Sequence, residues 1–358
     1  MQPPPTEIDW DEALERISTL TGVVMLVGAT DVGKSTLTLE CANRAVRAGR
    51  RAAVLDTDLG QGEVGPPGTL GVVRLDAPVA TLSEVKPRAL AFVGDTTPIG
   101  HLLGVVQGTR RMVSHALARD DELVLVDTSG VVHGRVAEKL KLAKLAVVEP
   151  DLVVVVQRGA EIARLTTLID GSSAAPVLHV RSPEAVRRKS PMYRRAQRAN
   201  RMRRHFELAR AIDLDAGQVR VVDAWLYTGE ALQRRRLELL SAALKTPIPH
   251  GEITPDGVWL CVERRPDRDG QAVLQEEFGR RRVHFTPVTA FRNLLVGLVG
   301  PEGHLLEIGL LQGVNFERAV FSVLTPVRSV GEVGQLHFGR LRLRPDGSEI
   351  ARLRPGDM

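Results

Sequence analysis

The feature that most constrains the fold is the stretch GATDVGKSTL, which begins at Gly28 and directly follows the apolar run VVMLV. Gly28 and Gly33, followed by Lys34 and Ser35, form the P-loop pattern in the strand, loop and helix context that this pattern needs. Glycines let the backbone curl so that successive N–H groups surround an anion at the N-terminus of the next helix. A chance match is the alternative, and the flanking strand and helix make it rare. The sequence therefore predicts a site for a nucleoside triphosphate.

Each residue type in this loop has a predicted role. Lys34 is expected to neutralise charge on the β- and γ-phosphates, and the Ser35 hydroxyl to bind Mg²⁺ together with those phosphates. The predicted nucleotide-binding residues are Gly28, Thr30, Asp31, Val32, Gly33, Lys34, Ser35 and Thr36. The chain has no Asn-Lys-x-Asp sequence of the kind that reads guanine in GTPases. The expected cofactors are therefore Mg²⁺ and ATP, or Mg²⁺ and an NTP of any base.

Composition places the chain among globular proteins. It has 358 residues, of which 43% are hydrophobic and 25% charged, so it is long enough for two or three domains. The polar, proline-rich start lacks the pattern of a secretory leader, and no apolar run approaches the roughly 18 residues of a membrane span. We expect a cytoplasmic protein without a membrane partner. The two cysteines are too few for a disulfide framework or a zinc site.

Apolar runs of strand length alternate with helix-length stretches over the first two thirds of the chain. The expected strands are 22–27, 52–56, 90–94, 123–127, 151–156, 176–180 and 218–223, and the expected helices include 35–48, 101–119 and 135–147. Runs that are apolar on both faces and alternate with helices predict a parallel sheet sandwiched by helices, as in P-loop NTPases. After about residue 246, turns at 301–303 and 345–347 separate short strands, which predicts a mostly antiparallel β domain. The predicted divisions are 1–20, a short extension; 21–245, the P-loop domain; and 246–358, the β domain.

Acidic residues follow two of the predicted strands. Asp56 and Asp58 lie where the second strand ends, and Asp127 ends the strand LVLVD. Because the carboxyl ends of strands in an open parallel sheet face the ligand crevice, these carboxylates are expected beside the P-loop. Asp56 and Asp127 are predicted to hold Mg²⁺ or its water, together with Ser35. In the alternative interpretation, both sequences form turns in which an aspartate caps the next helix.

The positive charge of the chain is concentrated in one segment. Residues 181–210 contain eleven Lys or Arg against two Glu, whereas the rest of the chain has 37 basic and 41 acidic side chains. A helix from Met192 would carry an apolar stripe that ends at Phe206, with Arg194, Arg198 and Arg201 on the opposite face. A solvated surface is the alternative, but acidic partners one turn away are nearly absent. Unpaired arginines bind phosphate, so the segment is predicted to close over the γ-phosphate or to hold nucleic acid.

Taken together, these motifs resemble those of the polynucleotide 5′-hydroxyl kinase family, which includes the eukaryotic tRNA-splicing and pre-rRNA-processing kinases. The resemblance rests on GATDVGKST, DTDLGQGEVGPPGTLG, FVGDTTPIGH, DTSGVVHG and VRRKSPMYRRAQRANRMRRHF, in this order over residues 22–225. The ending NLLVGLVGPEGHLLEIGLLQGVN is similar to the closing β domain of that family. Only about twenty residues precede the first strand, where the eukaryotic members carry a long N-terminal domain.

The resemblance implies transfer of the γ-phosphate of ATP or another NTP to the 5′-OH of RNA or DNA. The positions that it carries over are Asp58 and Gln61 beside the acceptor, Thr128 and Gly130 in the loop that clasps the nucleotide, and Arg194 and Arg198 in an arginine-rich lid at about 183–206. Together with Lys34, we take Asp58, Gln61 and the two lid arginines as the catalytic residues, with Asp58 as the base. Val131 stands where the family commonly has a tryptophan.

Two other functions stay open. The chain would serve as an ATP-bound scaffold for nucleic acid if it lacked kinase activity. A small-molecule kinase or an ATP-dependent synthetase of related fold would share the P-loop, but it would have no use for the basic segment. The sequence indicates no particular protein partner.

Overall fold

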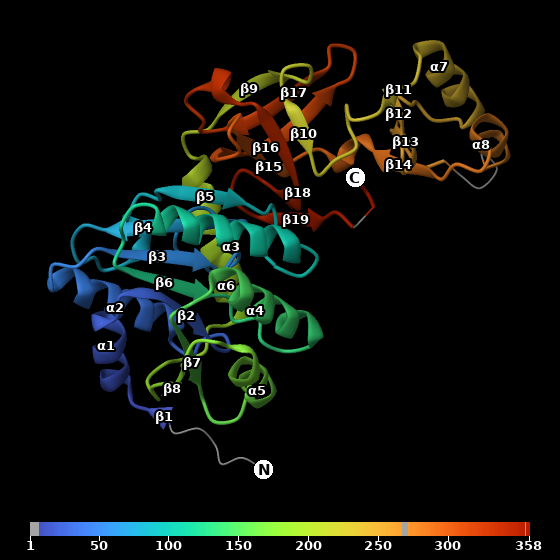
Figure 1. Cartoon of the computed structure of the whole chain (residues 1–358). Coiled ribbons are helices and arrows are strands. Elements are labelled where there is room, and N and C mark those ends of the chain that lie inside the picture. The colour runs from blue at the N-terminus through green and yellow to red at the C-terminus, as the bar shows by residue number, and fades with distance from the viewer. Residues whose placement is uncertain (1–6, 267–270, 355) are drawn as a thin grey trace. The chain divides into compact units, whose positions relative to one another are not determined.

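The computed structural model describes residues 7–266, 271–354 and 356–358 (Figure 1). Contacts within the chain divide it into two compact units, Met1–Arg198 and Ala199–Met358. Each unit has its own hydrophobic core. In the part of the chain that is described, no helix is long and apolar enough to cross a membrane.

The first unit is built on an eight-stranded sheet in the order β1-β8-β7-β2-β6-β3-β4-β5. Its strands are β1 (Glu7–Ile8), β2 (Gly22–Val27), β3 (Ala52–Thr57), β4 (Thr69–Leu75), β5 (Ala89–Phe92), β6 (Leu123–Thr128), β7 (Leu152–Gln157) and β8 (Val177–Arg181). Neighbouring strands are parallel from β1 to β3, as predicted, whereas β4 is antiparallel to both β3 and β5. The prediction missed β4, whose sequence follows a glycine- and proline-rich loop.

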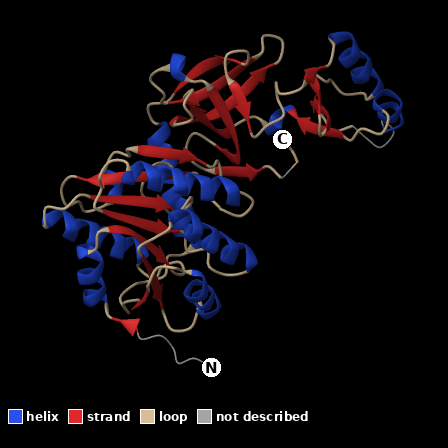
Figure 2. Ribbon diagram, in the orientation of Figure 1, coloured by secondary structure: helices blue, strands red, loops and turns tan. Residues whose placement is uncertain are grey.

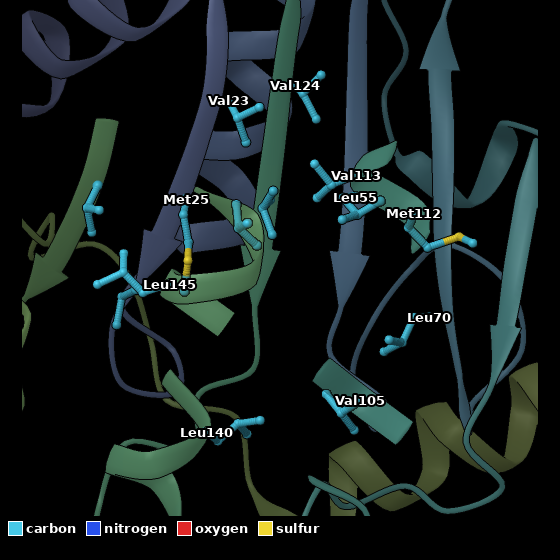
Figure 3. Packing of buried hydrophobic residues seen from close by; sticks show 14 of the residues in the cluster. Val23, Met25, Leu55, Leu70, Val105, Met112, Val113, Val124, Leu140 and Leu145 are labelled. Atoms are coloured by element: carbon cyan, nitrogen blue, oxygen red, sulfur yellow. The ribbon is translucent and has the colours of Figure 1, made fainter. Parts of the chain in front are cut away.

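Helices cover both faces of this sheet (Figure 2). They are α1 (Trp10–Thr19), α2 (Lys34–Arg47), α3 (Leu102–Leu117), α4 (Arg135–Val148) and α5 (Ala163–Ser172). On β2, Val23 and Met25 belong to the core under α3, α4 and α5, and Val24 and Leu26 belong to the core under α1 and α2. Figure 3 shows the first of these cores, where Leu140 of α4 and Met112 of α3 lie on the same side as Met25. The strands are apolar on both faces because both faces are buried.

Helix α6 (Pro191–Phe206) contains most of the basic segment. The predicted apolar stripe is half correct, since Met202 and Phe206 are buried but Met192 is 81% exposed. The physical reason is that Arg194 bonds to the P-loop, and a residue two positions earlier in a helix lies on nearly the opposite side. Arg198 is half-buried like Arg194.

The second unit contains a sheet in the order β10-β18-β15-β16-β17-β9, with β19 beside β18. Its strands are β9 (Arg210–Asp215), β10 (Arg220–Val222), β15 (Leu294–Val299), β16 (Leu305–Asn315), β17 (Val320–Thr325), β18 (Gln335–Leu343) and β19 (Glu349–Arg352). All pairs are antiparallel except β10 with β18, which agrees with the predicted β domain. The strand predicted at 218–223 belongs to this sheet and not to the parallel one. Because β9 and β10 pair here, the two units divide at 198, earlier than the predicted boundary at 245.

A smaller, four-stranded sheet in the order β11-β12-β13-β14 completes the second unit. Its elements are β11 (Glu230–Ala231), β12 (His250–Thr254), β13 (Gly257–Val262), β14 (Val283–Pro287), α7 (Arg234–Ala243) and α8 (Gln271–Phe278). The chain also forms short 3₁₀ helices at η1 (Leu82–Glu84), η3 (Val288–Ala290) and η4 (Val330–Glu332). Leu237, Leu240, Val258 and Leu260 are among the residues that form a separate core here.

One buried carboxylate organises the start of this smaller sheet. Glu252 is 1% exposed and accepts N–H groups from Tyr227 at 2.6 Å, Thr228 at 3.0 Å and Gly229 at 2.8 Å. Its other neighbour is His250 Nε2, at 2.6 Å. Burial alone would raise the pKa of Glu252, but the hydrogen bonds from His250 and the two backbone N–H groups of Gly229 and Tyr227 lower it below its usual value.

Candidate active site

The P-loop connects β2 to α2 and has a backbone that depends on glycine at two points. Gly33, which precedes the first residue of α2, has φ +98°, a left-handed conformation that glycine adopts without strain. A Cβ at Gly28 would lie 2.3 Å from the carbonyl oxygen of Val156. Asp31, between them, also has a positive φ, of 58°. The loop therefore opens onto the N-terminus of α2, where backbone N–H groups and the helix dipole favour an anion.

The first two side chains of α2, Lys34 and Ser35, each form a hydrogen bond with a neighbouring loop or strand. Lys34 Nζ donates to the Ala29 carbonyl at 2.7 Å, inside the loop. Burial lowers the pKa of Lys34 from its usual value, and the Asp127 carboxylate opposes this shift. Ser35 Oγ donates to Asp127 Oδ2 at 2.5 Å. The parallel pairing of β2 with β6 places the carboxylate there, because Leu26 and Asp127 are register partners.

Asp127 has the properties of a cation ligand. The residue is 4% exposed, and its second oxygen, Oδ1, is buried without a hydrogen-bond partner in the described part of the chain. Burial raises the pKa of Asp127, while Lys34 and Ser35 lower it. A buried carboxylate oxygen that no donor reaches costs free energy, and a bound cation beside Ser35 would remove that cost.

The loop after β3 contains both other predicted acids, in different environments. Asp56 is buried and accepts N–H groups from Asp58 at 3.0 Å, Val64 at 3.2 Å and Glu63. Burial and the nearby Asp127 raise the pKa of Asp56 to about 7. Both Asp56 oxygens therefore shape the loop in this structure.

Asp58 is half-buried, and its Oδ1 holds the loop that follows it. Oδ1 accepts N–H groups from Gly60 at 2.9 Å and Gln61 at 3.0 Å. The side chain of Gln61 turns back to donate to the Gly60 carbonyl at 2.9 Å. These bonds orient the Asp58 carboxylate before any substrate arrives, which a general base needs.

The loop after β6 touches the P-loop through Gly130. A Cβ at this position would lie 2.2 Å from Thr30 Oγ1, and Thr30 Oγ1 donates to the Gly130 carbonyl at 3.3 Å. Thr128, the other residue predicted in this clasp, points away, because its hydroxyl donates to the Leu26 carbonyl at 2.7 Å inside the sheet. Gly130 thus contacts the P-loop directly, whereas Thr128 lies inside the sheet and contacts β2.

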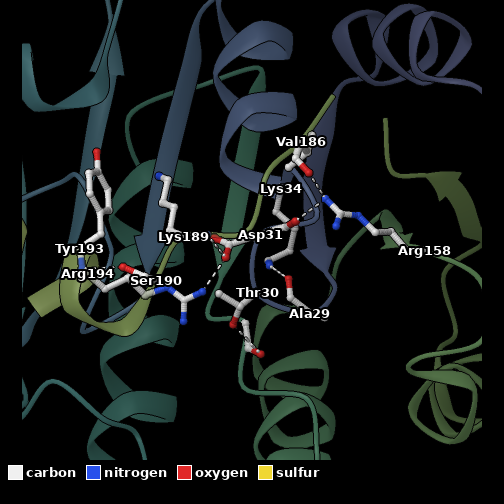
Figure 4. Close-up of polar contacts among 11 residues, drawn as sticks. Ala29, Thr30, Asp31, Lys34, Arg158, Val186, Lys189, Ser190, Tyr193 and Arg194 are labelled. Carbon is white, nitrogen blue, oxygen red and sulfur yellow. Dashed lines mark hydrogen bonds and ion pairs between the residues drawn. The ribbon is translucent and has the colours of Figure 1, made fainter. Parts of the chain in front are cut away.

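A cavity of about 280 Å³ lies against the P-loop. It is lined by Ala29, Thr30, Asp31, Val32, Gly130, His133, Arg158, Glu161, Arg188 and Arg194. Five of these were predicted from the sequence, namely Thr30, Asp31, Val32, Gly130 and Arg194, whereas Arg158 was not. Asp31, which lines this cavity, is surrounded by polar residues (Figure 4).

Asp31 joins the P-loop to the basic segment. Arg194 Nη2 donates to Asp31 Oδ2 at 2.5 Å, and the Lys189 N–H donates to the same oxygen at 2.9 Å. Arg158 Nη2 donates to the Asp31 carbonyl at 3.0 Å and to the carbonyl of Val186. Figure 4 shows Asp31 between the two arginines. The Nε of Arg194 is buried and has no hydrogen-bond partner among the residues described, so one N–H beside the P-loop is unsatisfied.

Comparison with known proteins agrees with this geometry. Residues 28–208 match the family model described as mRNA cleavage and polyadenylation factor CLP1 P-loop. The chain belongs to this family. The polyribonucleotide 5′-hydroxyl-kinase of Pyrococcus horikoshii is 31% identical over 343 residues, which cover 95% of this chain and 92% of the relative. The polyribonucleotide 5′-hydroxyl-kinase of Thermococcus kodakarensis is 32% identical over 342 residues, 94% of this chain and 92% of the relative.

A solved structure shows a similar fold. Clp1p, in its complex with Pcf11p, aligns with a TM-score of 0.59 over 93% of this chain and 78% of that chain. At 13% identity, this likeness concerns the fold alone.

Two further residues of this CLP1-family site were not predicted. Lys141 and Lys144 of α4 are fully buried, and their Nζ atoms lie under the carboxyl ends of β3 and β6. A signal was present in the sequence, because Ala137, Lys141, Lys144 and Val148 follow the helical spacing of a buried face.

Proposed function

We propose that this chain is a polyribonucleotide 5′-hydroxyl kinase that transfers the γ-phosphoryl group of ATP, or of another NTP, to the 5′-OH end of RNA. The observation that carries the proposal is the meeting, at one P-loop, of the Ser35–Asp127 pair and the Arg194 guanidinium, which bonds to Asp31 through Nη2 while its buried Nε has no hydrogen-bond partner among the described residues. The choice of RNA as the acceptor rests on the two archaeal relatives, since both are named polyribonucleotide 5′-hydroxyl-kinases. The excess of arginine in 181–210 supports a polyanionic acceptor over a small molecule.

The donor set at Ser35 and Asp127 fits Mg²⁺, which prefers oxygen ligands and keeps phosphate oxygens and waters in its shell. The buried Asp127 Oδ1 has no donor in the described structure, so it is available to the ion or to one of its waters. When bound, the ion would neutralise charge on the β- and γ-phosphates. We assign Asp56 to the loop that its oxygens hold, and its predicted part in orienting a metal-bound water stays a prediction.

The proposed reaction is an in-line displacement at the γ-phosphorus. The 5′-hydroxyl oxygen forms a bond to phosphorus, the bond from phosphorus to the β–γ bridging oxygen breaks, and ADP leaves with that oxygen. Asp58 accepts the proton of the attacking hydroxyl. Since its Oδ1 already receives two N–H groups, Oδ2 is the oxygen that we assign to this step. Lys34 and Arg194 stabilise the charge on the transferring group and on the leaving phosphate.

Incubation of the purified protein with γ-labelled ATP and a 5′-OH oligonucleotide tests the proposal. We expect label at the 5′ end of RNA, and DNA run in parallel measures the preference for the sugar. Lys34→Met removes the phosphate-binding charge and should abolish transfer, whereas Lys139→Met, at an exposed position of α4, should not. Binding of ATP without transfer to either polymer would favour the scaffold. Transfer to nucleosides alone, at a rate indifferent to salt, would favour a small-molecule kinase.

A further inference from the structure

Two lysines of α4 lie entirely inside the first unit. Lys141 Nζ donates to Thr128 Oγ1 at 2.9 Å and to the Ser129 carbonyl at 2.5 Å. Lys144 Nζ donates to Thr57 Oγ1 at 2.7 Å and to the Thr57 carbonyl at 3.3 Å. Both lysines have no exposed surface. Their ammonium groups thus end at the last residues of β3 and β6, the two strands that carry the predicted acids.

The threonines extend these contacts across the sheet. Thr57 Oγ1 donates to the Asp127 carbonyl at 2.7 Å, which joins the end of β3 to the end of β6. Thr128 Oγ1 donates to the Leu26 carbonyl at 2.7 Å, which joins the end of β6 to β2. Since each hydroxyl proton goes to a neighbouring strand, each lone pair is free to accept from lysine. Through the two threonines, the lysines of α4 are therefore linked to three adjacent strands, β3, β6 and β2, just below the P-loop.

The electrostatic surroundings explain why lysine suits these positions. Three carboxylates, Asp56, Asp58 and Asp127, gather above the strand ends, and two of them are 4% exposed. Burial lowers the pKa of Lys144 to about 8, while all three carboxylates raise it. Buried charges need hydrogen bonds or opposite charge nearby, and Lys144 has both, because it bonds to Thr57 and lies in the field of these carboxylates.

We propose that Lys141 and Lys144 are positioning residues for the phosphoryl transfer, each acting on a different part of the site. Lys144 holds Thr57, the residue between Asp56 and Asp58, so it sets the place of the base. Lys141 holds Thr128 and Ser129, the residues before Gly130, so it sets the place of the loop against the P-loop. This inference rests on the proposed kinase function.

The two assignments predict a split between kinetic parameters. Lys144→Met keeps the unbranched side chain as far as Cε and removes the ammonium group, so it should lower kcat with little change in the KM for ATP. Lys141→Met should raise the KM and the Kd for ATP instead. Residues that orient the ligands of a metal site typically contribute about 10–100-fold, and we expect changes of similar size here. The matched control is Lys139→Met on the exposed face of the same helix, which should leave both parameters unchanged.

The experiment measures thermal unfolding, the Kd for ATP, and kcat and KM on one 5′-OH RNA for the three methionine variants. Wild-type kinetics in both buried variants would overturn the proposal, and so would equal losses in both parameters for both variants. If a methionine variant does not fold, Thr57→Val and Thr128→Val test the same contacts from the other partner. Thr57→Val should follow the pattern of Lys144→Met, and Thr128→Val that of Lys141→Met. Unchanged kinetics in both Thr57→Val and Thr128→Val would also refute the proposed positioning roles.

Failure of the positioning proposal and failure of the proposed kinase function give different results. A wild-type protein that transfers no phosphate to RNA contradicts the kinase assignment. The Kd of ATP for Lys141→Met against Lys139→Met still tests the positioning role in that case, because it needs no acceptor.

Discussion

Gly130 offers a perturbation whose size follows from the geometry. A Cβ added there would lie 2.6 Å from the backbone N and Cα of Thr30, where ordinary contacts begin at 3.4 Å. Backbone atoms cannot rotate away as a side chain can, so Gly130→Ala must push the P-loop and the clasp loop about 0.8 Å apart. A displacement of about 1 Å in a phosphoryl-transfer site can cost about 10²-fold in rate. We expect kcat/KM for ATP to fall by about this factor.

The control is the same substitution where the added methyl group meets nothing. Gly171 lies in the last turn of α5, where no atom outside the helix backbone and the chain neighbours is within 4 Å of the built Cβ, so Gly171→Ala should fold normally with unchanged kinetics. The assay combines calorimetric titration with ATP, steady-state kinetics on one RNA, and thermal unfolding. If Gly130→Ala matches Gly171→Ala in ATP affinity and turnover, the contact between the two loops has no part in holding the nucleotide, and the reasoning fails.

Three further predictions concern acids and arginines. Asp58→Asn should lose about 10²–10⁴-fold in kcat with little loss of ATP affinity; a variant within threefold of wild type, beside an inactive Asp56→Asn, would move the base to Asp56. Arg194→Lys should lower kcat more than it raises the KM for ATP, because an ammonium group cannot replace a bidentate guanidinium. Arg203→Lys, at an exposed position of the same helix, should be neutral, and equal mild losses in both would indicate a general surface for nucleic acid. The lowered pKa of Glu252 means that its contribution to folding is present above the unfolded value of 4.5 and is lost as the pH falls through the folded pKa. Glu252→Gln should therefore lower the Tm at neutral pH, through about 1–3 kcal/mol of lost hydrogen bonding, and flatten its acid dependence; a Tm profile parallel to wild type would contradict this.

Local sequence signals were sufficient for much of the fold. The glycines before Lys34 specify a turn between strand and helix, and α2 begins at Lys34, one residue before the predicted start at 35. The turns at 301–303 and 345–347 separate β15 from β16 and β18 from β19, which pair as hairpins. Such features depend on residues that are close in the chain, and spacing and turn chemistry report on them directly.

Strand partners were harder to predict. The run at 218–223 is apolar enough for either sheet, and only its parallel pairing with β18 places β10 in the second unit. Strand β4 lies antiparallel between two strands that run the same way, an arrangement that alternation of strands and helices does not indicate. Hydrogen bonds between strands join segments far apart in the chain, so no local pattern specifies them.

The candidate site also combines features that local sequence predicts with features that depend on packing. The sequence by itself predicted the P-loop, the acids at the strand ends and the arginines of α6 as site residues, from residue type and position. Only the tertiary structure decided that Ser35 bonds to Asp127 across 92 residues, that Met192 faces outward while Arg194 turns to Asp31, and that two lysines are buried under the sheet. Helical spacing states which residues share a face, but the neighbours that cover this face come from distant segments. Burial and the partners of a charge are therefore decided when the chain packs.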